Sequence, residues 1–193
     1  MRYKETFTAM KMKKHGISED VIAKFAEIMP NVDSWPNAPS NTDRAKTIAA
    51  NKKFYQLMDK YLNEEQRLIL FEYGGTCRGG ETGRQAKVLQ SELAGMSIAE
   101  KIEKMNENPH IHSTRLNEDG TITAICGCHC LQARNNADVW HTSALPLHYG
   151  CSAGAALASL KKALNVKARI KSIDYPKSGD SKTLMEFTFE IIE

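Results

Sequence analysis

The 193-residue sequence lacks a long apolar run and lacks a strong excess of charge of either sign. No apolar run approaches the roughly 18 residues that a membrane-spanning helix needs. Lysine and arginine number 26 and aspartate and glutamate number 23, whereas a nucleic-acid-binding domain carries a much stronger basic bias. The sequence therefore predicts a protein that neither crosses a membrane nor binds nucleic acid. It leaves the oligomeric state open, a homo-oligomer included.

The first sixteen residues also lack the apolar segment of a secretory signal peptide. This absence predicts a cytoplasmic protein. Cysteine thiols stay reduced in the cytoplasm. We therefore expect thiols that are available for metal binding or nucleophilic chemistry rather than disulfide bonds.

Common catalytic motifs are missing as well. The sequence has no Walker phosphate loop, no GxGxxG and no GxSxG. Its composition is that of an ordinary globular protein, with 41% apolar and 25% charged residues. A chain of this length buries a core of its own and needs no metal merely to fold. The functional question therefore turns on the cysteines.

The first half of the chain is rich in helical patterns and has two strong helix-start signals. Asn63 stands three positions before Gln66, and Ser97 stands three positions before Glu100. This is the capping-box pattern, in which two side chains accept hydrogen bonds from each other's backbone N–H groups at the start of a helix. We therefore expect residues 1–107 to form a helical region.

The second half changes to strand patterns. Residues 110–116 and 121–127 flank the turn residues Asn117–Gly120, which predicts a β-hairpin. Residues 149–164 follow this hairpin and carry the apolar stripe of a helix.

A second hairpin is expected after that helix, because residues 166–175 and 183–192 both alternate apolar with polar side chains. Residues 108–193 are thus predicted to form an antiparallel α+β region. The fold class is α+β: a helical N-terminal half, then hairpin, helix and hairpin forming one antiparallel sheet. We expect both regions to make one compact unit.

The sequence has five cysteines: Cys77, Cys126, Cys128, Cys130 and Cys151. Three of them alternate over five residues, so on a strand they would share one face. A regular strand would spread their Cα atoms over roughly 13 Å, whereas zinc holds each sulfur at about 2.3 Å. Either the strand bends at Gly127, or only two of the three bind one ion, or a larger iron–sulfur cluster is held.

Cys77 and Cys151 are further candidate ligands. Each follows a glycine-containing segment and precedes a predicted helix. The start of a helix stabilises a thiolate and so lowers the pKa of the thiol. A cysteine can equally be a small buried apolar residue, so this position alone does not assign a role.

The histidines can be sorted by strand alternation. If the hairpin connection has an even number of residues, Ile111 lies opposite even-numbered residues such as Cys126, and His110 and His112 face away from the thiols. Only a β-bulge would reverse this expectation. His148 lies three residues before Cys151 and is a candidate ligand or catalytic base.

One further pattern begins at Cys151. This cysteine opens a helix with small residues, two strands follow, and Gly179–Asp180 turns the chain before the last strand. The stretch 149–192 resembles the vinyl-reductase-type small-ligand-binding domains and the L-2-amino-thiazoline-4-carboxylic acid hydrolase-like family of bacterial proteins. The resemblance implies binding of a small, partly apolar molecule, with zinc in some relatives. Met185 stands where relatives often carry a cysteine, so a metal site here would need thiolates from the cluster at 126–130.

Three functional hypotheses follow. The first is a small-molecule-binding or hydrolase-like protein in which Cys126, Cys128, Cys130 and Cys151 hold zinc, with Cys77 as a fifth candidate. As a hydrolase it would act on a small cyclic or amide-like compound through zinc-activated water. The second is an iron–sulfur protein for redox chemistry or sensing. The third is a metal-free thiol enzyme with Cys151 as nucleophile and His148 as its base.

Overall fold

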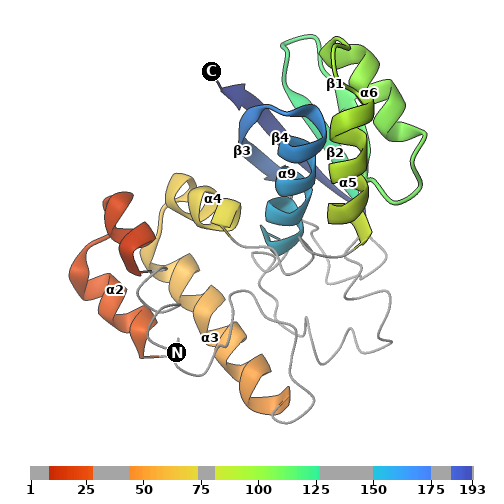
Figure 1. The fold of residues 1–193 in the computed structure, drawn as a ribbon. Coiled ribbons are helices and arrows are strands. Elements are labelled where there is room, and N and C mark those ends of the chain that lie inside the picture. Colours follow the sequence, from red (N-terminus) through yellow and green to blue (C-terminus); the bar gives the residue numbers. More distant parts are fainter. Residues whose placement is uncertain (1–8, 28–43, 74–80, 127–149, 175–183, 193) are drawn as a thin grey trace.

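The computed structural model describes residues 9–27, 44–73, 81–126, 150–174 and 184–192 (Figure 1). It has the predicted α+β architecture, with helices in the N-terminal half and an antiparallel sheet after them. The first helices are α2 (Glu19–Ala26), α3 (Arg44–Tyr61), α4 (Glu64–Tyr73), α5 (Glu81–Glu92) and α6 (Ile98–Asn106). The later elements are β1 (Ser113–Leu116), β2 (Ile122–Cys126), α9 (Gly150–Leu164), β3 (Lys167–Asp174) and β4 (Met185–Ile192).

Both predicted capping boxes are present. The Asn63 N–H donates to Gln66 Oε1 at 3.2 Å, and the Gln66 N–H donates to Asn63 Oδ1 at 2.9 Å. At the start of α6, Ser97 and Glu100 exchange the same pair of bonds. These bonds satisfy N–H groups that the first turn of a helix leaves unpaired. No helix in the described part of the chain combines the length and apolar character needed to span a bilayer.

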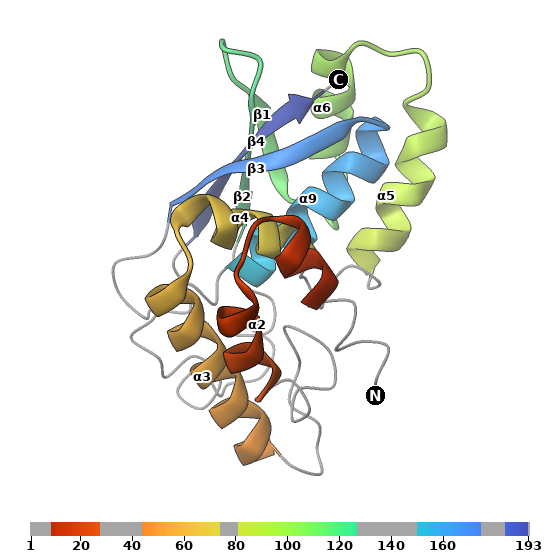
Figure 2. The ribbon, with the colours of Figure 1, turned by 90° about the vertical axis from the view of Figure 1, so that its left-hand side faces the viewer.

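The sheet has the strand order β1-β2-β4-β3, and all neighbouring strands are antiparallel. Helices α5, α6 and α9 cover one face of it, and α9 lies along β3 (Figure 2). The side chains on this face are apolar and almost fully buried, including Ile122, Ala124, Met185, Phe187 and Phe189. Strand alternation therefore places the core between the sheet and α9.

The opposite face of the sheet is polar. Arg115 pairs with Glu186 at 3.1 Å, and Arg169 pairs with Glu190 at 2.7 Å across β3 and β4. Exposed ion pairs of this kind contribute little stability individually. They do fix which face of the strands is solvated, since a shift by one residue would bury these charges.

Each edge strand is held by a side chain from a helix. Asn106, the last residue of α6, donates to the Thr114 carbonyl at 2.7 Å and accepts from the Thr114 N–H at 2.8 Å. Its carboxamide therefore takes the place of a neighbouring strand at the edge of β1. On β3, the Ile170 N–H donates to Glu72 Oε1 at 2.8 Å. Such contacts cover backbone groups through which an exposed edge could pair with another chain.

The connection between β1 and β2 is closed by its own side chains. The Asn117 N–H donates to the Thr121 carbonyl at 2.8 Å, and Gly120 adopts a φ of 79° that favours glycine. Asp119 Oδ1 accepts from the Thr121 N–H at 3.0 Å and from its hydroxyl at 2.6 Å. Hydrogen bonds from Thr121, followed by contact with Lys171, lower the pKa of Asp119 to about 2.

We expect the Asp119 carboxyl to titrate near pH 2 in the folded protein. Because this pKa lies below the ordinary value of 3.8, the stabilisation is fully present above that pH and is lost as the pH falls toward 2. An NMR titration of the carboxyl carbon measures the pKa. Asp119→Asn should remove this part of the acid dependence of unfolding, with Glu118→Gln as the matched control. Titration of Asp119 at its ordinary pKa would contradict the assignment.

Candidate functional site

Two of the five cysteines have a described backbone. Cys126 is the last residue of β2, and Cys151 is the second residue of α9. Cys77, Cys128, Cys130 and His148 lie outside the described residues. The structure does describe the strand and the helices that border these positions in the sequence.

Strand β2 ends at the same end of the sheet at which α9 begins. Strands β2 and β3 are both antiparallel to β4, so they run in the same direction. Helix α9 runs back against β3, because only Asn165 and Val166 connect the two and Asn165 has a left-handed φ of 55°. We call this end, where β2 finishes and α9 starts, the cysteine end of the fold.

Helix α5 also begins toward the cysteine end. It lies beside α9 and runs in the same direction (Figures 1 and 2). Gln90, near the end of α5, donates to Asn165 Oδ1 at 3.1 Å just after α9 ends. Cys77 is four residues before Glu81, where α5 begins, and four peptide units span at most about 14 Å.

The start of α9 is held by a close contact with α4. A Cβ atom added at Gly150 would overlap the ring of Phe71. The Phe71 side chain is itself fully buried in the core, so it has no free space into which to move. Glycine is thus required by close packing at Gly150, the residue before Cys151.

We expect Gly150→Ala to lower the free energy of unfolding by about 1–3 kcal/mol, the usual cost of adding a methyl group to a packed core. Equilibrium denaturation measures the loss. In a Phe71→Leu background the added methyl group should cost less, because the smaller side chain leaves room for it. Equal costs in the two backgrounds would show that the ring of Phe71 is not what excludes a side chain at Gly150.

The observed register corrects the placement of the histidines. Leu116 pairs with Ile122 and Ser113 pairs with Ile125, so five residues, 117–121, connect the strands. An odd connection sets even-numbered positions opposite even-numbered ones. The placement of Ile111 opposite Cys126, with His110 and His112 facing away, required an even connection and so does not apply; Ile111 and both histidines precede the paired residues of β1.

His110 itself lies in the turn before β1 and is exposed. Its backbone N–H donates to Asn108 Oδ1 at 2.9 Å. Hydrogen bonds from Gln85 and then Arg84 lower the pKa of Glu81, and the charge of His110 adds the smallest contribution. The Asn108 carboxamide N–H donates to Gln85 Oε1 at 3.2 Å, so the turn before β1 reaches the first turns of α5.

His15, which the sequence patterns did not single out, contacts the last residue of α4, Tyr73. His15 Nε2 is 3.2 Å from the Tyr73 hydroxyl, and Lys11 Nζ lies 4.4 Å from the centre of the Tyr73 ring. Burial, followed by the charges of Lys14 and Lys11, lowers the pKa of His15 and favours the neutral imidazole. Because 58 residues separate His15 from Tyr73, no local sequence signal reveals the pair.

Comparisons with protein-family models, curated proteins and solved structures find no match. The resemblance of residues 149–192 to small-ligand-binding and hydrolase-like families stays a prediction. Within the described ranges, no three His, Cys, Asp or Glu residues come together in a way that could hold a metal ion. A metal set at the cysteine end would therefore need thiols that lie outside those ranges.

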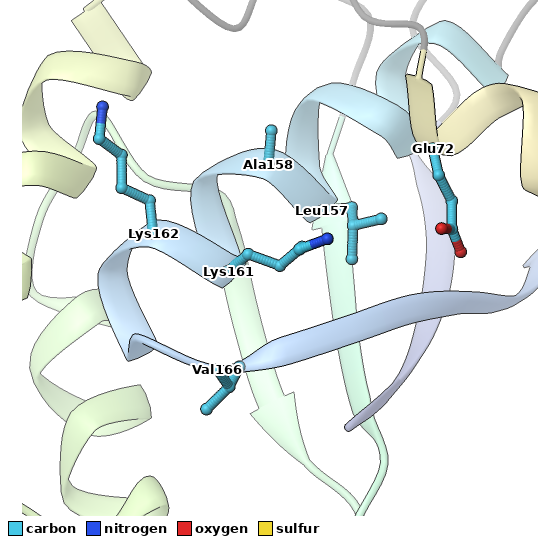
Figure 3. Close-up of a pocket in the computed structure, with 6 residues that line it drawn as sticks. All are labelled: Glu72, Leu157, Ala158, Lys161, Lys162 and Val166. Atoms are coloured by element: carbon cyan, nitrogen blue, oxygen red, sulfur yellow. The ribbon is translucent and has the colours of Figure 1, made fainter. Parts of the chain in front are cut away.

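A hollow of about 420 Å³ lies on the outer side of α9 (Figure 3). Its lining consists of Glu72, Leu157, Ala158, Lys161, Lys162 and Val166. The side chain of Lys162 points toward α5, where Nζ donates to the Gly83 carbonyl at 3.2 Å, while Lys161 extends toward the side of Glu72 (Figure 3). The hollow thus combines an apolar floor with two lysines and one glutamate, and of the two lysines Lys161 extends toward the side of Glu72. Leu157 is six residues, or about 9 Å along the helix, from Cys151.

Proposed function

We propose that this protein binds a small molecule and carries a cysteine-rich zinc site at the cysteine end of the fold. One observation supports the proposal: β2 ends, and α9 and α5 begin, toward the same end of the fold, although these elements come from distant parts of the sequence. Cys126, Cys128 and Cys130 leave from the end of β2, and Cys151 stands at the start of α9. Cys77 is tethered between α4 and α5.

The donor chemistry fits zinc. Soft thiolates favour zinc and iron–sulfur clusters over hard ions such as calcium or magnesium. The N-terminus of α9 stabilises an anionic thiolate at Cys151. Four thiolates would make a closed structural site, while a site with an open position would supply a Lewis acid that activates water for hydrolysis of a small cyclic or amide-like compound.

The hollow beside α9 supports the small-molecule part of the proposal. Leu157, which is 1% exposed, and the half-buried Ala158 and Val166 provide an apolar surface. Lys161 and Glu72 border this surface with opposite charges (Figure 3). Such a mixture of apolar lining and a few polar groups is typical of small-molecule sites.

We expect the protein, purified with reductant and without chelator, to contain about one zinc equivalent, since four thiolates suffice for one zinc site and the chain has five cysteines. Elemental analysis measures the content. Removal of zinc with a chelator should lower the melting temperature, because metal binding is coupled to folding. Iron with inorganic sulfide would instead assign an iron–sulfur cluster. Metal-free protein whose melting temperature ignores chelator would contradict a metal site of either kind.

The variant Cys151→Ser separates metal binding from thiol catalysis. If Cys151 is a ligand, as we propose, zinc content and melting temperature should fall together. If it is a free nucleophile assisted by His148, stability should barely change while iodoacetamide labelling falls. If it is a buried apolar residue, neither zinc content nor labelling should change. Ser152→Ala, one residue further along α9, is the matched control.

A further inference from the structure

We propose that the hollow beside α9 binds a small monocarboxylate with an apolar body, whose carboxylate pairs with the ammonium group of Lys161. This inference rests on the proposed small-molecule function and names the class of ligand. The side chains that line the hollow in Figure 3 all belong to the described part of the chain, and none of them is a cysteine.

The two lysines of the hollow differ in what their ammonium groups contact. Lys162 Nζ donates to the Gly83 carbonyl at 3.2 Å, so its charge is directed to α5. In the part of the chain that the structure describes, the Lys161 ammonium has no hydrogen-bond or ion-pair partner. A lysine can lay its apolar stem on apolar surface while its charged head stays in water. The head of Lys161 is therefore available to an anionic group at the rim of the hollow.

The negative charge of Glu72 is directed to β3. Glu72 Oε1 accepts from the Ile170 N–H at 2.8 Å. The pKa of the Arg169 guanidinium is raised by Glu190 first and then by the charge of Glu72, so Glu72 also acts on a cation of β3. Glu72 thus borders the hollow without making an ion pair with Lys161.

The C-terminal end of α9 carries partial negative charge, which would oppose an anion if its carbonyl groups were unpaired. Lys101 Nζ donates to the Leu164 carbonyl at 3.0 Å, and the Val166 N–H donates to the Lys161 carbonyl at 3.2 Å. With these carbonyl groups occupied, one ammonium group suits a ligand with a single negative charge. A phosphate group would need more donors, such as the N–H groups at a helix N-terminus.

The rest of the hollow suits an apolar body. Leu157 is 1% exposed and forms the floor, and Ala158 and Val166 are half-buried beside it. An apolar cavity of roughly 150 Å³ is enough to hold benzene, and the hollow measures about 420 Å³. It therefore has room for a ring and a short chain that ends at Lys161.

Titration of the full chain with 3-phenylpropionate, followed by NMR of the backbone amides, tests the proposal. The amides of Leu157, Ala158 and Val166 should respond. The neutral 3-phenylpropanamide and the cationic 3-phenylpropylamine have nearly the same shape. We expect the carboxylate to bind about tenfold more tightly than the amide at low salt, because a hydrogen bond to a charged group is stronger than one between neutral groups. The amine should bind more weakly still, and added salt should reduce the preference.

Lys161→Gln should lower the affinity for 3-phenylpropionate to that for the amide, and Lys161→Glu should make the amine the preferred probe. Lys167→Gln, at an exposed lysine outside the lining, is the matched control and should change neither affinity. Equal affinities of the three probes for the wild type would overturn the ligand class while small-molecule binding stands. A preference for the carboxylate that persists in Lys161→Gln would overturn the role of Lys161. If no probe shifts the amides of the hollow, the small-molecule part of the proposed function fails as well, whereas zinc content is measured separately.

Discussion

The contact between the ring of Phe71 and the backbone of Gly150 fixes the start of α9 against α4. Neither side can yield, because the ring is fully buried and the glycine has no side chain to lose. The position of α9 in turn sets β3, which follows it after two residues. Strand β3 pairs with β4 and β4 pairs with β2, so the strands follow from α9 outward in that order. The geometry of the cysteine end therefore depends on a packing contact that involves no cysteine.

The sheet transmits this placement because its register cannot slip. One face is apolar and covered by α9, while the other carries ion pairs such as Arg169–Glu190. A shift of one residue in any strand would exchange these faces. Asn106 and Glu72 add hydrogen bonds at the two edges. The elements around the candidate site are thus held in place by burial of apolar side chains and by hydrogen bonds, and not by metal binding.

Local patterns were sufficient to predict the elements but not the site. Some signals involve residues only a few positions apart, so they can be recognised in the sequence. Examples are the capping boxes at Asn63 and Ser97 and the alternation in β4. Which residues of β1 and β2 pair depends on whether four or five residues connect the strands, and the bond from the Asn117 N–H to the Thr121 carbonyl closes a connection of five residues. The contact between Phe71 and Gly150 is set by tertiary packing and leaves no local pattern at all.

The choice of ligands affects the charge of the proposed zinc centre. Zinc with four thiolates carries a net charge of −2, whereas three thiolates and a neutral imidazole leave −1. Charge is costly to place beside apolar surface unless it is compensated, and the cysteine end adjoins buried Met185 and Ala124. The N-terminus of α9 offers roughly half a positive charge toward compensation. A set of three thiolates and one imidazole would therefore leave less uncompensated charge against the core than an all-cysteine set.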